Sequence, residues 1–512
     1  MYSCKGMSVE AKVLRLPDVL AVKAELIADR VAHDDTRSVM TLSEWHHESD
    51  KLGGGLKAAG LQVGARVILP ISNDNAVEMA IAAIAVMKGG GIAVPVNTRL
   101  SEDEFIEYCN LIEPQFAITN VPEKLNHLNL EKVWLATDLP ANIDALPDQS
   151  QWGGYTDALI MSTSGTTGKI KGVVIKHADL TERLGDGRHF DKRGNSTLHA
   201  LPFTGTGGMQ GECLLPILTG QTCYTQPRFE PGEFLKLIKE KRPTTLYFVP
   251  TMLRLVLDHP DAGKADLSSV RNILTGTAPL QRDSVLRALK LWPHVRIRNS
   301  YGMSEGGIGV GTSSNEMVLK PGCVGKMPDN MQIRDKTSSV VAEGVVGEIY
   351  GYQKTQRRYW RDEEATSKGW VGGWTKTGDL GYVDEQGDLI LSGRSKELII
   401  RGGYNITPIE IENVIHDHPA VKEAAVLGVP HDVLGEDVAA AVTLNQGQTV
   451  TAEEIMDFCR DHLADNKVPR IVVFFDSLPK NQSEKILKRE LQPVLAKQAE
   501  AARLARHDNS KG

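Results

Sequence analysis

A stretch rich in hydroxyl groups and glycine is the first place where this sequence could do chemistry. Residues 161–172 read Met-Ser-Thr-Ser-Gly-Thr-Thr-Gly-Lys-Ile-Lys-Gly and lie between apolar runs at 158–161 and 173–175, which predict two strands. Glycine backbone lets successive N–H groups converge on one anion, while hydroxyls and lysines add donors and positive charge. The stretch therefore predicts a polyphosphate site, with a polar surface hairpin as the alternative. It is not a Walker A loop, because Thr163 stands where that motif requires glycine.

A second group of reactive residue types lies at residues 299–305, which read Asn-Ser-Tyr-Gly-Met-Ser-Glu. Tyr301 offers a flat face for a base, and Gly302 lets the backbone approach closely. Ser304 can donate to a phosphate, and Glu305 can hold the Mg²⁺ that neutralises a triphosphate. The same residues satisfy G-x-S-x-G, the nucleophile elbow of serine hydrolases. That elbow must lead directly into a helix, and the glycine-rich segment that follows is a poor helix start, so a hydrolase using Ser304 is the remote alternative.

The elements that must position these residues follow an alternating pattern. Apolar runs at 67–71, 92–96, 116–119 and 133–136 predict strands, and helices are predicted between them. One of these helices is opened by Ser101 with Glu104 three residues on, which is a capping box. Alternation of strand and helix indicates a parallel, doubly wound α/β layer. Residues 320–393 change to short strands and turns, which indicate a small β-barrel, and the tail forms a compact unit of helices and strands.

Seven stretches, taken in order, resemble the signatures of the acyl-adenylate-forming superfamily, which includes acyl-CoA synthetases, peptide-synthetase adenylation domains and beetle luciferases. They lie at 161–172, 275–280, 299–305, 377–381, 393–397, 401–406 and 478–487. The chain departs from the pattern at three places. Ile170 replaces a proline, Phe203 and Thr204 stand where an aromatic residue and a histidine are usual, and Glu484 replaces a glycine.

The resemblance implies an α/β fold with two domains. A large N-terminal domain of two packed α/β layers plus a small β-barrel is expected over residues 1–393, and it would bind ATP and the acid. A hinge is expected at 394–396. Residues 397–512 would form a small, mobile α+β domain that carries the catalytic lysine.

The resemblance also implies the roles of individual residues. The catalytic residues would be Lys485, Glu305 and Thr166, with Glu305 also holding the metal, and Lys396 would be the hinge residue. The acyl pocket would be lined by Phe203, Thr204, Gly207, Met303 and Gly307, and the acceptor site by Gly402, Gly403 and Tyr404. ATP would be bound by Thr163, Ser164, Gly165, Thr167, Gly168, Lys171, Gly276, Thr277, Ala278, Tyr301, Gly302, Ser304, Asp379 and Arg394.

The implied reaction is that of an AMP-forming acyl-CoA synthetase, an acid–thiol ligase. A carboxylate and MgATP would give acyl-AMP and pyrophosphate, and the acyl group would pass to coenzyme A. An amide ligase with an amine acceptor is the second candidate, because Thr204 replaces a histidine and Glu484 adds a carboxylate beside Lys485. A non-enzymatic nucleotide-binding protein on this fold is the third, and intact Lys485 and Glu305 count against it. Glycines at 205, 207 and 208 and at 306, 307 and 309 predict room for a ring-bearing acid, unless they serve only turns.

Composition limits the remaining possibilities. The chain has 512 residues, 41% hydrophobic and 24% charged, as in ordinary globular proteins, and its net charge of −7 argues against broad nucleic-acid binding. Six scattered cysteines contain no C-x-x-C pair, so neither a zinc site nor a disulfide framework is predicted and a cytoplasmic location is expected. The longest apolar run, 79–87, is far shorter than the ~20 residues that span a bilayer, and the N-terminus shows no signal-peptide core. His416 and His418 are predicted to be solvated.

Overall fold

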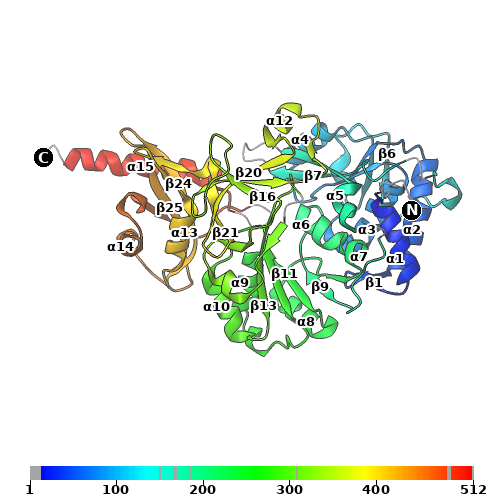
Figure 1. The fold of residues 1–512 in the computed structure, drawn as a ribbon, viewed down its shortest axis with the longest axis horizontal. Coiled ribbons are helices and arrows are strands. Elements are labelled where there is room, and N and C mark those ends of the chain that lie inside the picture. The colour runs from blue at the N-terminus through cyan, green and yellow to red at the C-terminus, as the bar shows by residue number, and fades with distance from the viewer. Residues whose placement is uncertain are drawn as a thin grey trace, which may run out of the picture.

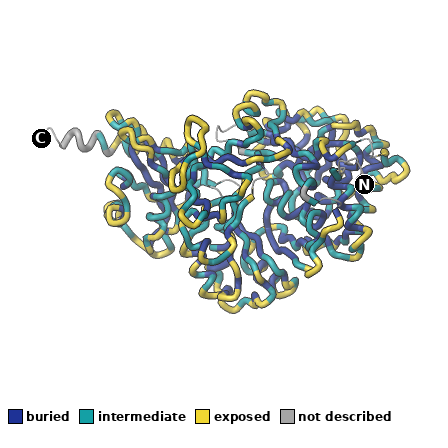
Figure 2. The backbone as a smooth tube through the Cα atoms, in the orientation of Figure 1, coloured by how far each residue is buried: buried dark blue, intermediate teal, exposed yellow. Residues whose placement is uncertain are grey.

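The computed structural model describes residues 13–148, 152–164, 170–184, 187–306, 309–480 and 486–509. Figure 1 shows a large body that contains the N-terminus and, at the left, a smaller body that ends in the long C-terminal helix. In Figure 2 the strands inside each body are buried, while the exposed segments are mostly loops at the rim. The predicted α/β class, with a large first part and a small α+β tail, is confirmed.

The first sheet has seven strands in the order β18-β8-β7-β4-β3-β5-β6. Its central pairs are parallel, and β8 pairs antiparallel with both β7 and β18. Strands β4 and β5 are buried along their whole length, as expected for parallel strands covered on both faces. The bounds are β3 (Arg66–Leu69), β4 (Ile92–Pro95), β5 (Phe116–Thr119), β6 (Lys132–Leu135), β7 (Asp157–Ser164), β8 (Ile170–Lys176) and β18 (Arg358–Tyr359).

The second sheet has eight strands in the order β14-β13-β12-β11-β9-β10-β1-β2. The six inner strands are parallel, and the two edge strands pair antiparallel with their neighbours. The bounds are β1 (Val31–Asp34), β2 (Val39–Thr41), β9 (Ser196–His199), β10 (Thr222–Thr225), β11 (Thr245–Phe248), β12 (Asn272–Gly276), β13 (Arg296–Gly302) and β14 (Gly309–Gly311).

Helices cover both sheets. One apolar cluster joins α1 (Leu16–Leu26), α2 (Leu42–Ala58) and α3 (Ala76–Lys88) to inward-facing residues of the two sheets, so these helices form a shared core. The outer face of the seven-stranded sheet packs on α4 (Glu102–Ile112), which begins at the predicted capping box of Ser101 and Glu104. The outer face of the eight-stranded sheet packs on α8 (Pro231–Lys241), α9 (Pro250–Asp258) and α10 (Arg282–Leu291).

The region predicted to form a small β-barrel, called the barrel region below, is a six-stranded antiparallel sheet around its own small apolar cluster, and its strand order β15-β21-β20-β17-β16, with β19 beside β20, is open and not closed. Its strands are β15 (Cys323–Lys326), β16 (Met331–Arg334), β17 (Gly347–Tyr352), β19 (Trp370–Val371), β20 (Trp374–Val383) and β21 (Asp388–Arg394). Strand β18 leaves this region to pair with β8, which ties the barrel region to the first sheet. In Figure 1 this sheet lies between the two large sheets and the C-terminal body.

The C-terminal body is a five-stranded sheet in the order β23-β22-β25-β24, with β26 beside β25. Helices α13 (Pro408–His416) and α14 (Ala452–His462) pack in one apolar cluster of this sheet, and α15 (Lys488–Asn509) packs in another. The short helix η8 (Ser395–Glu397) links β21 to this sheet, where the sequence predicts the hinge. The strands are β22 (Ile399–Arg401), β23 (Tyr404–Ile406), β24 (Val421–His431), β25 (Gly435–Leu444) and β26 (Ile471–Phe474).

The remaining helices are short. They are η1 (Asn73–Asn75), η2 (Pro122–Leu125), η3 (Ile143–Ala145), α5 (His177–Thr181), η5 (Glu182–Leu184), α6 (Thr206–Gly208), the π-helix η6 (Met209–Cys213), α7 (Leu215–Thr219), η7 (Ala262–Lys264), α11 (Asn315–Leu319), α12 (Glu363–Gly369) and η9 (Asp465–Lys467). Within the described segments, no helix combines the length and the apolar character needed to cross a membrane.

Candidate active site

A large cleft lies where the two α/β sheets, the barrel region and the C-terminal body meet. Its volume is about 2720 Å³, larger than a pocket for one small molecule, so it can hold more than one substrate. Strands β12 and β13 end in it, and the carboxyl ends of parallel strands are where α/β sheets bind ligands. Predicted site residues gathered along its walls are Thr163, Lys171, Thr204, Gly207, Gly276, Thr277, Ala278, Tyr301, Gly302, Met303, Ser304, Glu305, Asp379, Arg394 and Lys396.

Other predicted residues lie at the edge of the described segments or outside them. Gly165, Thr166, Thr167, Gly168, Gly307 and Lys485 lie outside the described residues. Ser164 is the last residue of β7, at the point where the predicted phosphate turn begins. For these positions the assigned roles stay predictions.

A carboxylate held by two partners marks one end of the cleft. The Tyr301 hydroxyl donates to Asp379 Oδ2 at 2.7 Å, and Arg394 Nε lies 3.0 Å from Asp379 Oδ1. Strands β20 and β21 pair Asp379 directly with Arg394, so the sheet register brings the two together. Burial, together with the charge of Asp379, raises the pKa of the Tyr301 hydroxyl, which therefore stays a donor. Since an ionised carboxylate offers about four lone-pair sites, Asp379 can accept two further hydroxyl groups.

The predicted adenine-facing turn follows β12 directly. Gly276 ends the strand and pairs with Ser300 of β13. Thr277 has a φ of 72°, which is unusual for a residue other than glycine and is typical of backbone held in place at functional sites. The turn therefore presents backbone groups of 276–278 to the same cleft as Tyr301.

The end of the cleft where the sequence predicts phosphate binding contains a buried hydroxyl without a partner among the described residues. Thr163 Oγ1 is buried and has no hydrogen-bond partner among the described residues. Thr163 lies opposite Lys171 in the β7–β8 pair, and the ammonium of Lys171 lies 4.4 Å from the centre of the Tyr359 ring and 3.8 Å from Asp362. A buried hydroxyl without a partner is costly, and a phosphate oxygen would satisfy it.

Ser304 and Glu305 lie on the loop between β13 and β14. The Ser304 hydroxyl is 2.6 Å from the hydroxyl of Thr206, and the Ser304 carbonyl accepts a 2.6 Å bond from the buried Arg357. Tyr359 donates to Glu305 Oε1 at 3.1 Å, so one tyrosine contacts both the carboxylate and Lys171. The loop joins two antiparallel strands rather than a strand and a helix, which does not match a nucleophile elbow. This geometry gives no support to the serine-hydrolase alternative.

One predicted pocket residue is wrong. Phe203 is only 1% exposed and stacks on His199 with ring centres 5.5 Å apart, so its side chain belongs to the shared core instead of the cleft. The neighbouring Thr204 and Gly207 do line the cleft. The chain turns at Pro202, whose carbonyl would lie 2.0 Å from a Cβ at Gly208, and this tight turn directs Phe203 inward.

The segment that precedes α15 reaches the cleft from the C-terminal body. Lys480 and Ile486, which flank the predicted catalytic segment, both line the cleft. Lys488 is half-buried between Glu412, at 2.7 Å, and Glu397, at 3.1 Å, next to the predicted hinge. Burial lowers the pKa of Lys488, but the two carboxylates outweigh it and the net shift is upward, so the ammonium stays charged. These ion pairs fix the start of α15 against the cleft.

The predicted acceptor loop lies elsewhere. Gly402, Gly403 and Tyr404 form the β22–β23 turn, and none of them lines the cleft. Tyr404 is 64% exposed on the outside of the C-terminal body. In this orientation the structure therefore brings the Lys480–Ile486 side of the body to the cleft and leaves the acceptor loop away from it.

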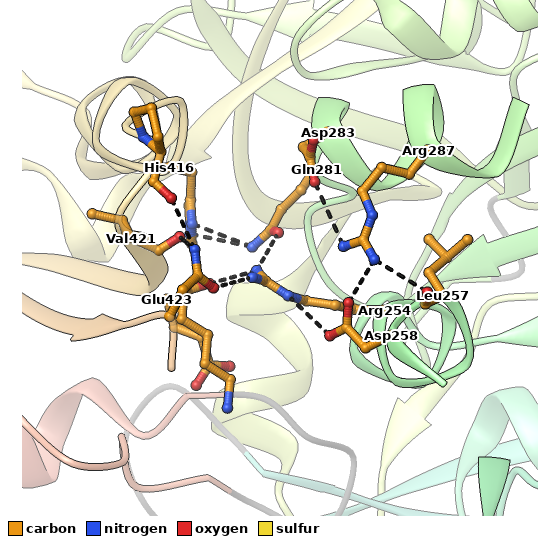
Figure 3. A network of polar contacts seen from close by, with 12 residues as sticks. Arg254, Leu257, Asp258, Gln281, Asp283, Arg287, His416, Val421 and Glu423 are labelled. Atoms are coloured by element: carbon orange, nitrogen blue, oxygen red, sulfur yellow. Dashed lines mark hydrogen bonds and ion pairs between the residues drawn. The ribbon is translucent and has the colours of Figure 1, made fainter. Parts of the chain in front are cut away.

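A polar contact holds the C-terminal body against the N-terminal one (Figure 3). Arg254 of α9 donates to the carbonyl of Lys422 at 2.6 Å and to Asn445 Oδ1 at 2.9 Å. Gln281 lies 3.3 Å from a ring nitrogen of His416, at the end of α13. Burial, with the nearby charge of Arg254, lowers the pKa of His416 to about 4. The prediction that His416 is solvated is therefore wrong, because its partners come from the other body.

A buried group of metal-ligand types lies beside the cleft but does not suit a metal. His199, Glu212 and Cys223 bring their ligand atoms within 4.8 Å of one another. His199 Nδ1 accepts a 2.9 Å bond from the Leu201 N–H, so the neutral ring carries its proton on Nε2, where a metal would need a lone pair. Burial raises the pKa of Glu212 and of Cys223 well above their usual values, so both keep their protons. The group is a neutral network.

Four residues with contacts at the cleft carry no motif in the sequence. They are Tyr247, Arg254, Arg357 and Lys488. Each of them contacts residues that are distant in the sequence. Arg357, for example, donates to the carbonyl of Ser304. Spacing along the sequence therefore gives no signal for these residues.

Comparison with known proteins identifies the family of this chain. The chain matches the model of AMP-binding enzymes over residues 20–359 and the model of the AMP-binding enzyme C-terminal domain over residues 410–485. It therefore belongs to the AMP-binding enzyme family, whose members form acyl-adenylates. The predicted family resemblance is confirmed.

Individual relatives are similar over nearly the whole chain. A 2-succinylbenzoate–CoA ligase of Bacillus cytotoxicus is 31% identical, over 94% of this chain and 99% of the relative. A feruloyl-CoA synthase of Amycolatopsis sp is 32% identical, over 91% of this chain and 95% of the relative. ATP-bound MatB from Rhodopseudomonas palustris superposes with a TM-score of 0.84 at 27% identity, over 94% of this chain and 99% of that chain.

Proposed function

We propose that this protein is an ATP-dependent acid–thiol ligase that activates a carboxylic acid as its acyl-AMP and transfers the acyl group to coenzyme A. The observation that carries the proposal is the placing of the Tyr301–Asp379–Arg394 group and the unpaired Thr163 hydroxyl in one cleft. The first matches the diol of a ribose, and the second matches a phosphate. The names of the similar CoA ligases support the choice of acceptor.

ATP binding follows from the residues at the two ends of the cleft. Asp379 would accept the ribose hydroxyls while Tyr301 and Arg394 hold its carboxylate in place. Backbone groups of 276–278 would face the adenine. Thr163 and Lys171 would bind the terminal phosphates, and Ser164, Gly165, Thr166, Thr167 and Gly168 are proposed to complete that cradle.

The residues at the phosphate end fit a magnesium ion. Mg²⁺ is usually bound by one or two carboxylates together with substrate phosphates and water. Glu305 supplies one carboxylate on the cleft wall, and Tyr359 connects it to Lys171 of the phosphate site. The ion, when bound, offsets phosphate charge. Glu305 would hold it, and Tyr359 would orient Glu305.

In the first half-reaction an oxygen of the substrate carboxylate would attack the α-phosphorus of ATP. A new P–O bond forms, the bond to the β-phosphate oxygen breaks, and pyrophosphate leaves with the electron pair. Such a step is promoted mainly by positioning and by positive charge where negative charge develops. Ser304 would donate to the α-phosphate, with Thr206 and Arg357 fixing its loop, and Lys485 would bridge the carboxylate and the α-phosphate.

In the second half-reaction a thiol would attack the acyl carbonyl and release its proton to solvent, so that a C–S bond forms, the acyl C–O bond to the phosphate breaks and AMP leaves with the electron pair. Gly402, Gly403 and Tyr404 lie outside the cleft in the present orientation, so this step requires the C-terminal body to turn. Lys396, in the short helix that links the bodies, is the proposed hinge residue.

The test is acid-dependent exchange between ATP and labelled pyrophosphate, measured over a panel of carboxylic acids. Exchange with at least one acid supports adenylation, and no exchange with any acid contradicts it. Enzyme, ATP, Mg²⁺ and the accepted acid are then incubated with coenzyme A or with an amino-acid panel, and products are identified by mass. Thioester supports the proposal. Amide without thioester would favour the amide ligase, for which Thr204 on the cleft wall is the structural argument.

A further inference from the structure

A tyrosine hydroxyl surrounded by glycines lies in the wall of the cleft. Tyr247 stands on β11, and its Oη lies 3.7 Å from an ideal Cβ at Gly207 and 3.5 Å from one at Gly276. An ideal Cβ at Gly211 would lie 3.7 Å from Tyr247 Cε1. Three glycines from two different walls therefore surround one aromatic side chain, and all four residues line the cleft.

The backbone does not require glycine at two of these positions. Gly207 and Gly211 do not have a positive φ, and the contacts that a Cβ would make there are ordinary ones. Gly208 differs, because its Cβ would lie 2.0 Å from the Pro202 carbonyl. Gly207 and Gly211 are thus compatible with alanine, and their missing side chains leave open space along the Tyr247 ring.

This space adjoins the atoms that would react. Gly207 follows Thr206, whose hydroxyl is 2.6 Å from that of Ser304. Ser304 is the residue proposed to donate to the α-phosphate. An acyl group attached at that phosphate would therefore extend past Thr206 toward Tyr247.

Two polar groups of this wall have no partner among the described residues, and both can donate a hydrogen bond. Tyr247 is 9% exposed and makes no hydrogen bond to the described residues, and burial, with the neighbouring Glu212, raises the pKa of its hydroxyl to about 12. Gln210 Nε2 is buried without a partner, while its Oε1 accepts from Arg357 at 3.3 Å. Arginine can only donate, so the amide of Gln210 must turn its NH₂ away from Arg357. A ligand that satisfies the Gln210 NH₂ must accept a hydrogen bond, and an accepting group can also take the proton that the Tyr247 hydroxyl offers.

We propose that Tyr247 determines acid specificity, and that the preferred acid carries a flat ring with a hydrogen-bond-accepting oxygen that the Tyr247 hydroxyl binds. The ring occupies the space left by Gly207 and Gly211. This proposal rests on the proposed adenylation function and names the substrate class of that site. A site built to hydrogen-bond a substrate group discriminates strongly against analogues that lack it, because its own buried group is then left unpaired.

The experiment compares wild type with Tyr247→Phe in pyrophosphate exchange. The acids are benzoate and cinnamate, their hydroxy and methoxy derivatives at each ring position, and acetate and hexanoate. Wild type should prefer one oxygen-substituted ring acid. Tyr247→Phe should lower kcat/KM for that preferred acid by about 10- to 100-fold relative to wild type. For the same ring acid without the oxygen substituent, kcat/KM should stay within about 3-fold of the wild-type value. Tyr224→Phe is the matched control and should change neither value, because it removes a hydroxyl from β10 of the same sheet, which β9 separates from β11.

The glycines give a second, independent variant. Gly211→Ala should reduce turnover of ring acids more than that of acetate, while Gly263→Ala, whose Cβ would meet only Leu291 at 3.8 Å, should not. Best turnover of the wild type on acetate or hexanoate would overturn the proposal while leaving adenylation intact. An equal loss on substituted and unsubstituted ring acids in Tyr247→Phe would also overturn it. Absence of exchange with every acid would instead refute the proposed function itself.

Discussion

The contact made by Arg254 gives a sharp test of how the two bodies cooperate. Its guanidinium reaches from α9 to the Lys422 carbonyl and to Asn445 of the C-terminal body, and its side chain is only 18% exposed (Figure 3). A hydrogen bond to a charged group contributes about 1.5–3 kcal/mol to stability. When the two bodies separate, water molecules bind the freed groups and recover part of this free energy. We expect Arg254→Ala to destabilise this docked orientation by about 2–3 kcal/mol, or roughly 30- to 150-fold in its equilibrium constant.

The assay separates the two half-reactions. The docked orientation brings the Lys480–Ile486 side of the C-terminal body to the cleft, so Arg254→Ala should lower ATP–pyrophosphate exchange by about 10-fold or more. Transfer from prepared acyl-adenylate to coenzyme A should be unchanged or faster. Arg287→Ala is the matched control, because that arginine bonds only to Leu257 and Asp258 in Figure 3, within the N-terminal body, apart from a weaker approach to Asp283. Equal losses in both half-reactions, or none in either, would refute the reasoning.

Four further outcomes follow from the site. Lys485→Ala should remove most exchange but spare transfer from acyl-adenylate; equal losses would mean a structural role. Lys396→Pro should spare acyl-AMP formation and block transfer, and intact transfer would disprove the hinge. Asp379→Asn should raise the KM for ATP by roughly 10-fold or more, against little change in the KM for the acid. When the bodies are docked, burial and the charge of Arg254 lower the pKa of His416 to about 4, whereas an exposed histidine has a pKa near 6.5. At a pH between these two values, His416 therefore binds a proton when the bodies separate. Docking should therefore weaken as pH falls through that window, and the exchange-to-transfer ratio should fall with it. A His416→Gln variant that keeps the same pH dependence would contradict this.

The local elements were predictable because their causes lie close together in the sequence. The capping box of Ser101 and Glu104 starts α4 where predicted, and the structure shows the same kind of box, formed by Thr451 and Glu454, at the start of α14. Buried parallel strands such as β4 and β5 appear as continuous apolar runs. The alternation of strands and helices predicts the α/β layers for the same reason.

The site was predictable only where residues match a motif. Tyr301, Asp379 and Arg394 carry such a match, and the structure brings them together. Phe203 matched a position in a family segment, but the tight turn at Pro202 directs its side chain into the core. The prediction for His416 considered only its neighbours on the same helix. Its partner Gln281 belongs to the N-terminal body, and the sequence pattern does not show how the two bodies pack together.

The register of β20 and β21 links the proposed ribose site to the proposed hinge, which bears on the order of steps in the proposed catalytic cycle. Arg394 is both the partner of Asp379 and the last residue before η8, and Ser395 donates to the Gly378 carbonyl at 3.1 Å. The proposed ribose site and the proposed hinge therefore share one short piece of backbone. By thermodynamic reciprocity, if filling the ribose site favours one orientation by some factor, that orientation tightens nucleotide binding by the same factor. When the nucleotide leaves, the C-terminal body would lose its preference for that orientation. Nucleotide release would thus free the proposed hinge for the next turnover.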